Sequence, residues 1–419
     1  MSKVSCVVSC PIDTYSGYGA RSRDLVKAII KAKPDWDVKI LPQRWGNTRF
    51  GYLQDHTEVE LKNRLLTNLN YKPDVWMQIS VPNEFQKVGK YNIGVTAGIE
   101  TTICAAEWIP GCNNMDLVLT SSEHSKSVFE HTSYTVQDNR TGTKQELKVS
   151  TPIEVIFEGV DLSKYTDQAV VSIDLPIEEK FAYLVVGHWM KGGLGHDRKN
   201  IGYTIKAFLE TFKNKNNPPA LILKTSQVGT SIIDREVILD KIDDIRKTVS
   251  GTLPNIYLLH GEMTDQEING LYNHPKIKAM ISFTKGEGFG RPLLEFTTTG
   301  KPVIASGWSG QLDFLHKDYS FLVGGDLENV HPSAVVDKMI LKESKWFKPD
   351  DGQVGTALKE SFKNYKELLK RSRKHKKYTK DNFSLDKMVE LVDTVLSNNV
   401  PEFAQKIELK LPSLKLPKM

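Results

Sequence analysis

The 419-residue sequence has few cysteines and no long apolar run, and each absence excludes a class of protein. Its four cysteines, Cys6, Cys10, Cys104 and Cys112, form neither a C-x-x-C pair nor a zinc spacing, so neither a disulfide framework nor a zinc site is predicted. We interpret them as small buried residues of a reduced, cytoplasmic protein. No apolar stretch approaches the roughly 20 residues that span a bilayer, and the amino-terminal segment does not resemble a secretory signal.

Length and composition favour a globular protein with two domains. Hydrophobic residues make up 39% of the chain and charged residues 26%, which excludes wholesale disorder. One hydrophobic core rarely serves more than about 250–300 residues. We place an amino-terminal domain at residues 1–163, a linker of mixed charge at 164–180 and a carboxyl-terminal domain at 181–384.

Short apolar runs alternate with helical stretches in both halves. In the first half, the strand-like run Val4–Cys10 precedes a loop with glycines and a helix expected over residues 20–33. In the second half, residues 182–187 precede another glycine-rich loop and a helix expected over 201–213. This alternation predicts an α/β protein made of two Rossmann-like, doubly wound domains that face a cleft. Residues 135–150 are polar and are expected as an exposed hairpin or insertion. The tail from residue 401 is expected as an edge strand or a loose end.

Positive charge is concentrated near the carboxyl terminus. The net charge of the whole chain is +5, yet residues 359–380 contain ten Lys and Arg against Glu360 and Glu367. Such a run is typical of a solvated helix face, of a nucleic-acid contact or of a contact with anionic lipid. The run has no wide apolar face, which favours nucleic acid over lipid. The four cations chosen as candidate acceptor-binding residues are Lys370, Arg371, Arg373 and Lys374.

The most informative segment is SFTKGEGFGRPLLE, residues 282–295. A strand is expected to end near residue 283, and the chain then turns through Gly286, Gly288 and Gly290. Glycines allow a ligand to approach the backbone. Pro292 suits the first turn of a helix, whose free amides would favour an anion such as a pyrophosphate. Ligands of open α/β sheets bind beyond the carboxyl ends of the strands, where this loop is expected.

Glu287 and Glu295, with seven residues between them, carry a resemblance to a known family. Together with PIEVIFEGVD (152–161), HDRKNIGYTIKAF (196–208), LLHGEMTDQEINGLYN (258–273) and TGKPVIAS (299–306), the chain resembles the retaining glycosyltransferases of the family 4 type. These segments occur in both halves and in the family's order. The resemblance implies the B-type fold of two Rossmann-like domains, with a helix over 385–397 and the tail crossing back onto the first domain. Bacteriophage DNA-modifying glycosyltransferases share this architecture.

The resemblance also implies roles for individual residues. Glu287 would contact hydroxyls of the donor sugar and Glu295 the nucleotide ribose. Glu100 would lie on the acceptor side as a second catalytic candidate, with a structural hydrogen-bonding role as the alternative. Lys199 matches the family's phosphate-binding lysine. The remaining donor-binding candidates are Gly17, Gly19, His188, Arg198, Lys224, Gly288, Phe289, Gly290 and Arg291.

The sequence departs from the family pattern at one position. His188 stands where the family often has arginine, so Arg198, Lys191 or Lys224 is expected to supply the charge. Trp308 and Gln311 could line the sugar pocket or only pack within their loop, and Gly17 and Gly19 could be plain turn glycines. His124, His131, His260 and His316 have no ligand spacing and are interpreted as ordinary polar residues.

These residues together predict a metal-independent retaining glycosyltransferase that uses a nucleotide diphosphate sugar, with a uridine diphosphate (UDP) sugar favoured. Fixed cations would stabilise the leaving diphosphate, and no carboxylate nucleophile or D-x-D cluster is required. The favoured acceptor is a hydroxymethylated base in double-stranded DNA, which the enzyme would have to extrude. Lipid, polysaccharide and protein acceptors remain open, as do a phosphorylase or epimerase on the same scaffold and an idle nucleotide- or nucleic-acid-binding protein. The oligomeric state is left open.

Overall fold

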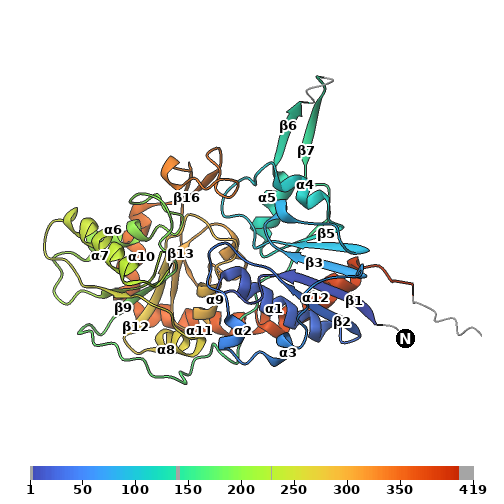
Figure 1. Cartoon of the computed structure of the whole chain (residues 1–419). Coiled ribbons are helices and arrows are strands. Elements are labelled where there is room, and N and C mark those ends of the chain that lie inside the picture. The colour runs from blue at the N-terminus through green and yellow to red at the C-terminus, as the bar shows by residue number, and fades with distance from the viewer. Residues whose placement is uncertain (1–2, 138–141, 228, 405–419) are drawn as a thin grey trace, which may run out of the picture.

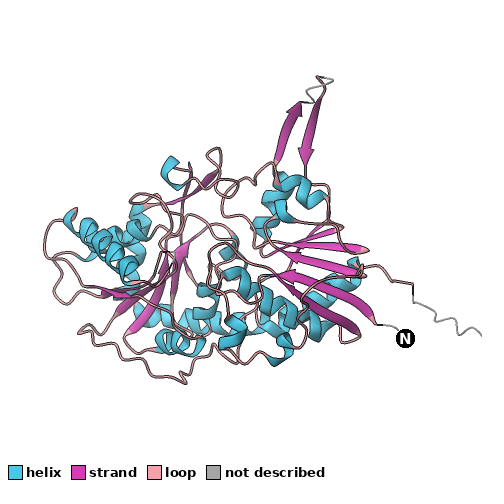
Figure 2. Ribbon diagram, in the orientation of Figure 1, coloured by secondary structure: helices cyan, strands magenta, loops and turns pink. Residues whose placement is uncertain are grey.

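The two halves of the chain each form a parallel six-stranded sheet covered by helices (Figures 1 and 2). The computed structural model describes residues 3–137, 142–227 and 229–404. Most of the tail expected as an edge strand or loose end therefore lies outside the described residues. The predicted α/β class with two doubly wound sheets is confirmed.

The first sheet has the strand order β2-β1-β3-β4-β5-β8. Its chain order is β1 (Val4–Cys10), α1 (Gly17–Ala32), β2 (Trp36–Pro42), α2 (Tyr52–Asp55), α3 (Val59–Lys62), β3 (Val75–Ile79), η1 (Pro82–Glu84), β4 (Tyr91–Val95), α4 (Trp108–Asn113), β5 (Leu117–Thr120), α5 (Glu123–His131), β6 (Ser133–Gln137), β7 (Lys144–Lys148) and β8 (Ile153–Val155).

The second sheet repeats this arrangement as β11-β10-β9-β12-β13-β14. Its chain order is β9 (Ala182–Val186), α6 (Ile201–Phe212), β10 (Ala220–Lys224), α7 (Ile232–Lys247), β11 (Ile256–Leu259), α8 (Asp265–Asn273), β12 (Ile277–Ser282), α9 (Arg291–Thr297), β13 (Val303–Ser306), η2 (Gly310–Asp313), β14 (Phe321–Val323), β15 (Gly325–Asn329), η3 (Pro332–Ala334), β16 (Lys345–Pro349), α10 (Asp351–Lys363), α11 (Tyr365–Asn382) and α12 (Leu385–Asn399).

Local sequence explains where these elements begin. The central strands β3 and β5 are buried along their whole length, as expected for parallel strands that are covered on both faces. Helix α1 begins three residues before the predicted start because the Ser16 hydroxyl accepts a hydrogen bond from the Gly19 amide, a serine cap. Thr264 and Glu267 form a capping box at the start of α8.

Helix α12 leaves the second half and packs on the first. Met388, Val392 and Leu396 of α12 lie in the same hydrophobic core as the strands of the first sheet. Lys33, just after α1, donates to Asp393 at 2.6 Å. A single β-bridge joins Val160 and Ser384, so the chain crosses between the halves twice at nearly the same place.

Two hairpins stand outside the sheets. Strands β6 and β7 pair antiparallel and project from the first half (Figure 1), so the described part of the polar stretch is a hairpin, as predicted; its residues 138–141 lie outside the described residues. Strands β15 and β16 form a second antiparallel hairpin, which the sequence did not predict. The Thr102 amide of the first half donates to the Lys345 carbonyl of β16, and the Lys345 amide donates to the Thr102 hydroxyl, so this hairpin bridges the two halves.

Candidate active site

The candidate site lies where the strand order of the second sheet reverses. Strand β9 has β10 on one side and β12 on the other, so the connections leave it in opposite directions. Ligands of doubly wound sheets bind at such a switch point, beyond the carboxyl ends of the strands. The loop after β9 carries Arg198 and Lys199, and the loop after β12 carries Glu287. Because β9 and β12 are neighbours, these three side chains meet.

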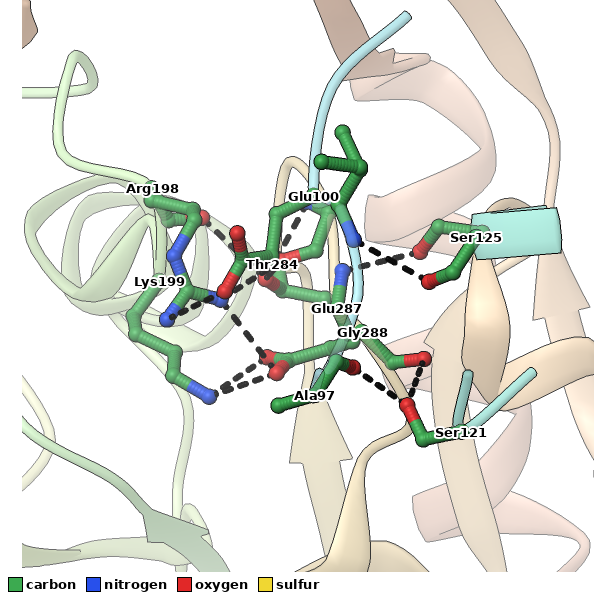
Figure 3. Close-up of polar contacts among 12 residues, drawn as sticks. Ala97, Glu100, Ser121, Ser125, Arg198, Lys199, Thr284, Glu287 and Gly288 are labelled. Atoms are coloured by element: carbon green, nitrogen blue, oxygen red, sulfur yellow. Dashed lines mark hydrogen bonds and ion pairs between the residues drawn. The ribbon is translucent and has the colours of Figure 1, made fainter. Parts of the chain in front are cut away.

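Glu287 is the centre of a buried ion cluster (Figure 3). Lys199 Nζ lies 2.6 and 2.7 Å from its two carboxylate oxygens, and Arg198 Nη1 lies 3.3 Å from one of them. Arg198 also donates to the Gly286 carbonyl at 2.8 Å. Burial opposes ionisation of Glu287, but the charges of Lys199 and Arg198 outweigh it and lower the pKa of the carboxyl below its usual value. Glu287 is therefore ionised at neutral pH.

A second ion cluster joins the two halves next to this one. Arg291 Nε lies 2.7 Å from Glu295, one helical turn later, and Arg291 Nη1 lies 2.6 Å from Asp24 of α1. Burial raises the pKa of Glu295 to about 7, although the charge of Arg291 acts in the opposite direction. Among the described residues, Arg291 is the cation that pairs with the Glu295 carboxylate.

The two halves touch through glycines. A Cβ added to Gly286 would lie 1.9 Å from the Glu100 carbonyl oxygen, and one added to Gly288 would lie 2.5 Å from that of Ala97. Ser121 donates to the Gly288 carbonyl at 3.2 Å across the same junction, which is drawn in Figure 3. The glycines of this segment are thus required by the contact between the halves. Gly290 has φ +101° and precedes α9, a conformation that favours glycine.

Glu100 reaches the same junction from the first half. Its carboxylate lies 3.7 Å from Arg198 Nη2, so Arg198 stands between Glu100 and Glu287. Trp308 adjoins Gly286, since a Cβ there would lie 3.0 Å from its ring, and His124 packs edge-on against Trp308. The Phe289 side chain is buried in the core of the second half, so the role expected for Phe289 is left to its backbone amide.

The other residues considered for the phosphate-binding charge have hydrogen-bond partners away from Glu287. Lys224 Nζ donates to the Gly261 carbonyl, and Lys191 is exposed and donates to the Val335 carbonyl. His188 bonds Ser226, and burial together with the charge of Lys199 lowers its pKa, so it is neutral at pH 7. Of the residues considered for the missing arginine charge, Arg198 is the one that contacts Glu287.

Three further predicted residues have structural surroundings. Gly19 is buried, and a Cβ there would lie 2.2 Å from the Thr14 carbonyl oxygen, so packing alone requires glycine. Gly17 is exposed, and an added Cβ would meet no atom within 4 Å. Gln311 is fully buried and donates to the Ser306 carbonyl, while its Oε1 has no partner in the described part of the chain.

The basic run forms the end of α10 and most of α11, and seven of its cations are exposed. Two are on α10, at positions 359 and 363, and five are on α11, at positions 366, 370, 373, 374 and 377; the five share one face of α11 because most of them are three or four residues apart. Arg371 differs, because its guanidinium donates to the carbonyls of Lys317, Asp318 and Ser320. A Cβ on Gly300, beyond the end of α9, would lie 3.7 Å from the Arg373 Cα. Helix α11 therefore passes the carboxyl end of α9, whereas the candidate site lies at the amino end of α9. The two are separated by the length of α9, roughly 10 Å.

Sequence reasoning identified Arg291 and Gly288 as candidates but missed Asp24 and Ser121, their partners in the first half. Asp24 and Arg291 are 267 residues apart in the chain, and Ser121 and Gly288 are 167 apart. No local pattern marks such pairs. The available signal was the position of Asp24 in the chain. Asp24 lies in the helix that follows the first strand, and this helix begins near the carboxyl ends of the strands, where the two halves meet.

Comparisons with known proteins agree with this architecture. No protein-family model and no curated protein matches the sequence. Among solved structures, a glycosyltransferase from Rickettsia africae is similar over 95% of this chain and 100% of its own, with 14% identity and a TM-score of 0.62. Sucrose-phosphate synthase from Thermosynechococcus elongatus covers 94% and 98%, with 12% identity and a TM-score of 0.60. HepE of Anabaena, in complex with UDP-glucose, covers 94% and 99%, with 12% identity and a TM-score of 0.59.

These similarities show the fold of the chain. It is the two-domain, Rossmann-like arrangement of the B-type glycosyltransferases. Among the described residues, no helix is long and apolar enough to cross a membrane, and no three His, Cys, Asp or Glu side chains are grouped so that they could hold a metal ion.

Proposed function

We propose that this protein is a retaining glycosyltransferase that moves a sugar from a nucleotide diphosphate sugar to an acceptor hydroxyl. The observation that carries this proposal is the placement of Glu287, Lys199 and Arg198 together at the switch point of the second sheet. The similar fold of HepE, a protein whose structure contains UDP-glucose, supports a UDP-sugar as the donor.

The proposed roles follow from charge. A leaving diphosphate accumulates negative charge, and Lys199 and Arg198 are cations held in place before the reaction, so they would stabilise that charge without reorganisation. Glu287 would accept hydrogen bonds from the donor sugar, and Glu295 from the ribose. These two cations supply the charge that a metal ion would otherwise provide, and metal independence is therefore part of the proposal.

The proposed acceptor is a hydroxymethylated base in double-stranded DNA, modified in the cytoplasm, which would be the host cytoplasm if the protein comes from a bacteriophage. The exposed cations of α10 and α11 support contact with a phosphate backbone. Their position at the far end of α9 means that they would hold DNA away from the reacting centre. Lipid, polysaccharide and protein acceptors are the alternatives.

The test is the release of nucleoside diphosphate from a panel of UDP-, GDP- and ADP-sugars, with and without hydroxymethylated DNA and with chelator present throughout. We expect release from a UDP-sugar that DNA accelerates, and NMR of the product should show the anomeric configuration of the donor. The Glu287→Gln variant is the negative control. Binding of UDP without any release would instead favour the second candidate, a nucleotide-binding protein of the same fold without catalytic activity.

A further inference from the structure

Trp45 lies in the loop between β2 and α2 and has unusual surroundings for a tryptophan. Of the seven tryptophans in the chain, only Trp45 and Trp308 are partly exposed, and Trp45 is the one of these two that packs on no hydrophobic cluster of the described residues. Its indole is stacked on the Tyr18 ring, with centroids 3.9 Å apart and planes 22° apart. In the described part of the chain no ring or cation is stacked on its second face.

Tyr18 connects this stack to the candidate site. Its hydroxyl accepts a hydrogen bond from the Ala97 amide at 3.1 Å. The Ala97 carbonyl accepts from Ser121, whose hydroxyl also donates to the Gly288 carbonyl. Gly288 follows Glu287 directly. The Tyr18–Trp45 stack therefore lies at the carboxyl edge of the first sheet, beside the loop that faces Glu287.

Cations alternate with aromatic residues along the same loop. Arg44 precedes Trp45 and Arg49 precedes Phe50, which is 51% exposed. Arg44 is exposed and makes no hydrogen bond or ion pair within the described residues. Arg49 lies over the Tyr15 ring at 4.5 Å and pairs at 2.5 Å with Glu262, so the loop contacts the second half.

We propose that Trp45, supported by Tyr18, stacks the acceptor base of a nucleic acid, and that Arg44 contacts the adjoining phosphate. This inference rests on the proposed glycosyl transfer and names its acceptor subsite. Bases stack on aromatic side chains in sites whose flanking cations bind the backbone, and this loop supplies both. A neutral sugar could also stack on Trp45, but it would not use the positive charge of Arg44.

The first test uses the whole chain and a short single-stranded oligonucleotide with one 5-hydroxymethylcytosine. Stacking of the base should quench tryptophan fluorescence, and this quenching should be absent in Trp45→Ala. In transfer assays Trp45→Ala should raise the KM for the oligonucleotide about 5- to 150-fold, and Trp45→Phe should restore most of the loss. The Kd for UDP, measured without acceptor, should be the same in all three proteins. The matched control is Tyr71→Ala. Tyr71 is 42% exposed and precedes β3, so it lies at the amino-terminal ends of the strands, away from the candidate site.

The second test separates a base from a sugar. Arg44→Ala should weaken oligonucleotide binding and reduce the slope of log K against log salt by about 0.7 for a single strand. An unchanged KM in Trp45→Ala would overturn the inference. Quenching by a neutral oligosaccharide but not by the oligonucleotide would overturn it as well, and would leave glycosyl transfer standing. If no nucleotide sugar is bound or turned over, the proposed function itself fails.

Discussion

Replacing Glu287 by glutamine should tighten the binding of UDP while it abolishes sugar transfer. In the ligand-free protein the Glu287 carboxylate neutralises both cations that are proposed to hold the diphosphate, at 2.6 and 2.7 Å from Lys199 and 3.3 Å from Arg198. A diphosphate has to compete with this carboxylate for the two cations. Glutamine keeps the shape of the side chain and removes the competing charge.

The size of the effect follows from the contacts that are lost. A hydrogen bond to a charged group contributes about 1.5–3 kcal/mol, so UDP should bind about 10- to 150-fold more tightly to Glu287→Gln. The same substitution leaves Lys199 without a counter-charge and leaves Arg198 with only the more distant Glu100, at 3.7 Å. The ligand-free variant should therefore unfold at a lower temperature, and UDP should raise its midpoint more than that of the wild type. Alanine would add a cavity to this loss and is a poorer probe.

Isothermal titration of UDP into the two proteins measures this prediction. The matched control is Glu295→Gln, because Glu295 pairs with Arg291 and is proposed to contact the ribose. It removes a carboxylate from the same loop and helix but should weaken UDP binding. Equal or weaker binding of UDP to Glu287→Gln would refute the idea that this carboxylate occupies the cations before the donor arrives.

Three further changes probe other parts of the structure. Gly286→Ala would place a Cβ 1.9 Å from the Glu100 carbonyl oxygen and should lower the transfer rate about 100-fold by separating the halves, whereas Gly229→Ala, with no atom within 4 Å, should leave the rate unchanged. Arg371→Ala removes contacts to three carbonyls and should lower the free energy of unfolding by about 1–3 kcal/mol in urea titrations; loss of the same size at the exposed Lys374 would contradict this assignment. Burial raises the pKa of Asp197 from 3.8 to about 6, so its carboxyl favours the folded state less as pH rises from about 4 to 6. Asp197→Asn should therefore gain up to about 3 kcal/mol of stability relative to wild type between pH 4 and 7, and an unchanged difference would refute the shift.

The sequence predicted the sheets better than the junction between them. Runs such as Val4–Cys10 are apolar throughout because parallel strands are buried on both faces, so the strands were visible. Helix α1 was placed three residues late because its cap, Ser16, lies before two glycines that suggested a loop. The hairpin of β15 and β16 was missed because half-exposed short strands carry little periodicity.

The same distinction holds for the candidate site. Glu287, Glu295 and Lys199 were found because local motifs mark them. The ion-pair partner of each charged side chain could not be predicted, because it depends on which strands are neighbours in the fold. Arg198 was one of three candidates for a missing charge, and only the adjacency of β9 and β12 distinguishes it from Lys224. Likewise, no pattern in the basic run shows that Arg371 faces a loop while Lys374 faces solvent.

The two arginines that pair with carboxylates of both halves, Arg198 and Arg291, are also proposed to bind the donor. Arg198 lies between Glu100 of the first half and Glu287 of the second, and Arg291 lies between Asp24 and Glu295. A third ion pair across the junction, Arg49 with Glu262, is half exposed and contributes little to holding the halves together.

A donor that draws either arginine toward its phosphates or ribose would therefore change the strength of the contact between the halves. By linkage, weakening that contact must change donor affinity by the same factor. Neutralising Asp24, which the proposed reaction does not use, should then alter the Kd for UDP without any loss of a donor contact. Titration of UDP into Asp24→Asn measures this coupling, and a Kd equal to that of the wild type would show that the halves close independently of the donor.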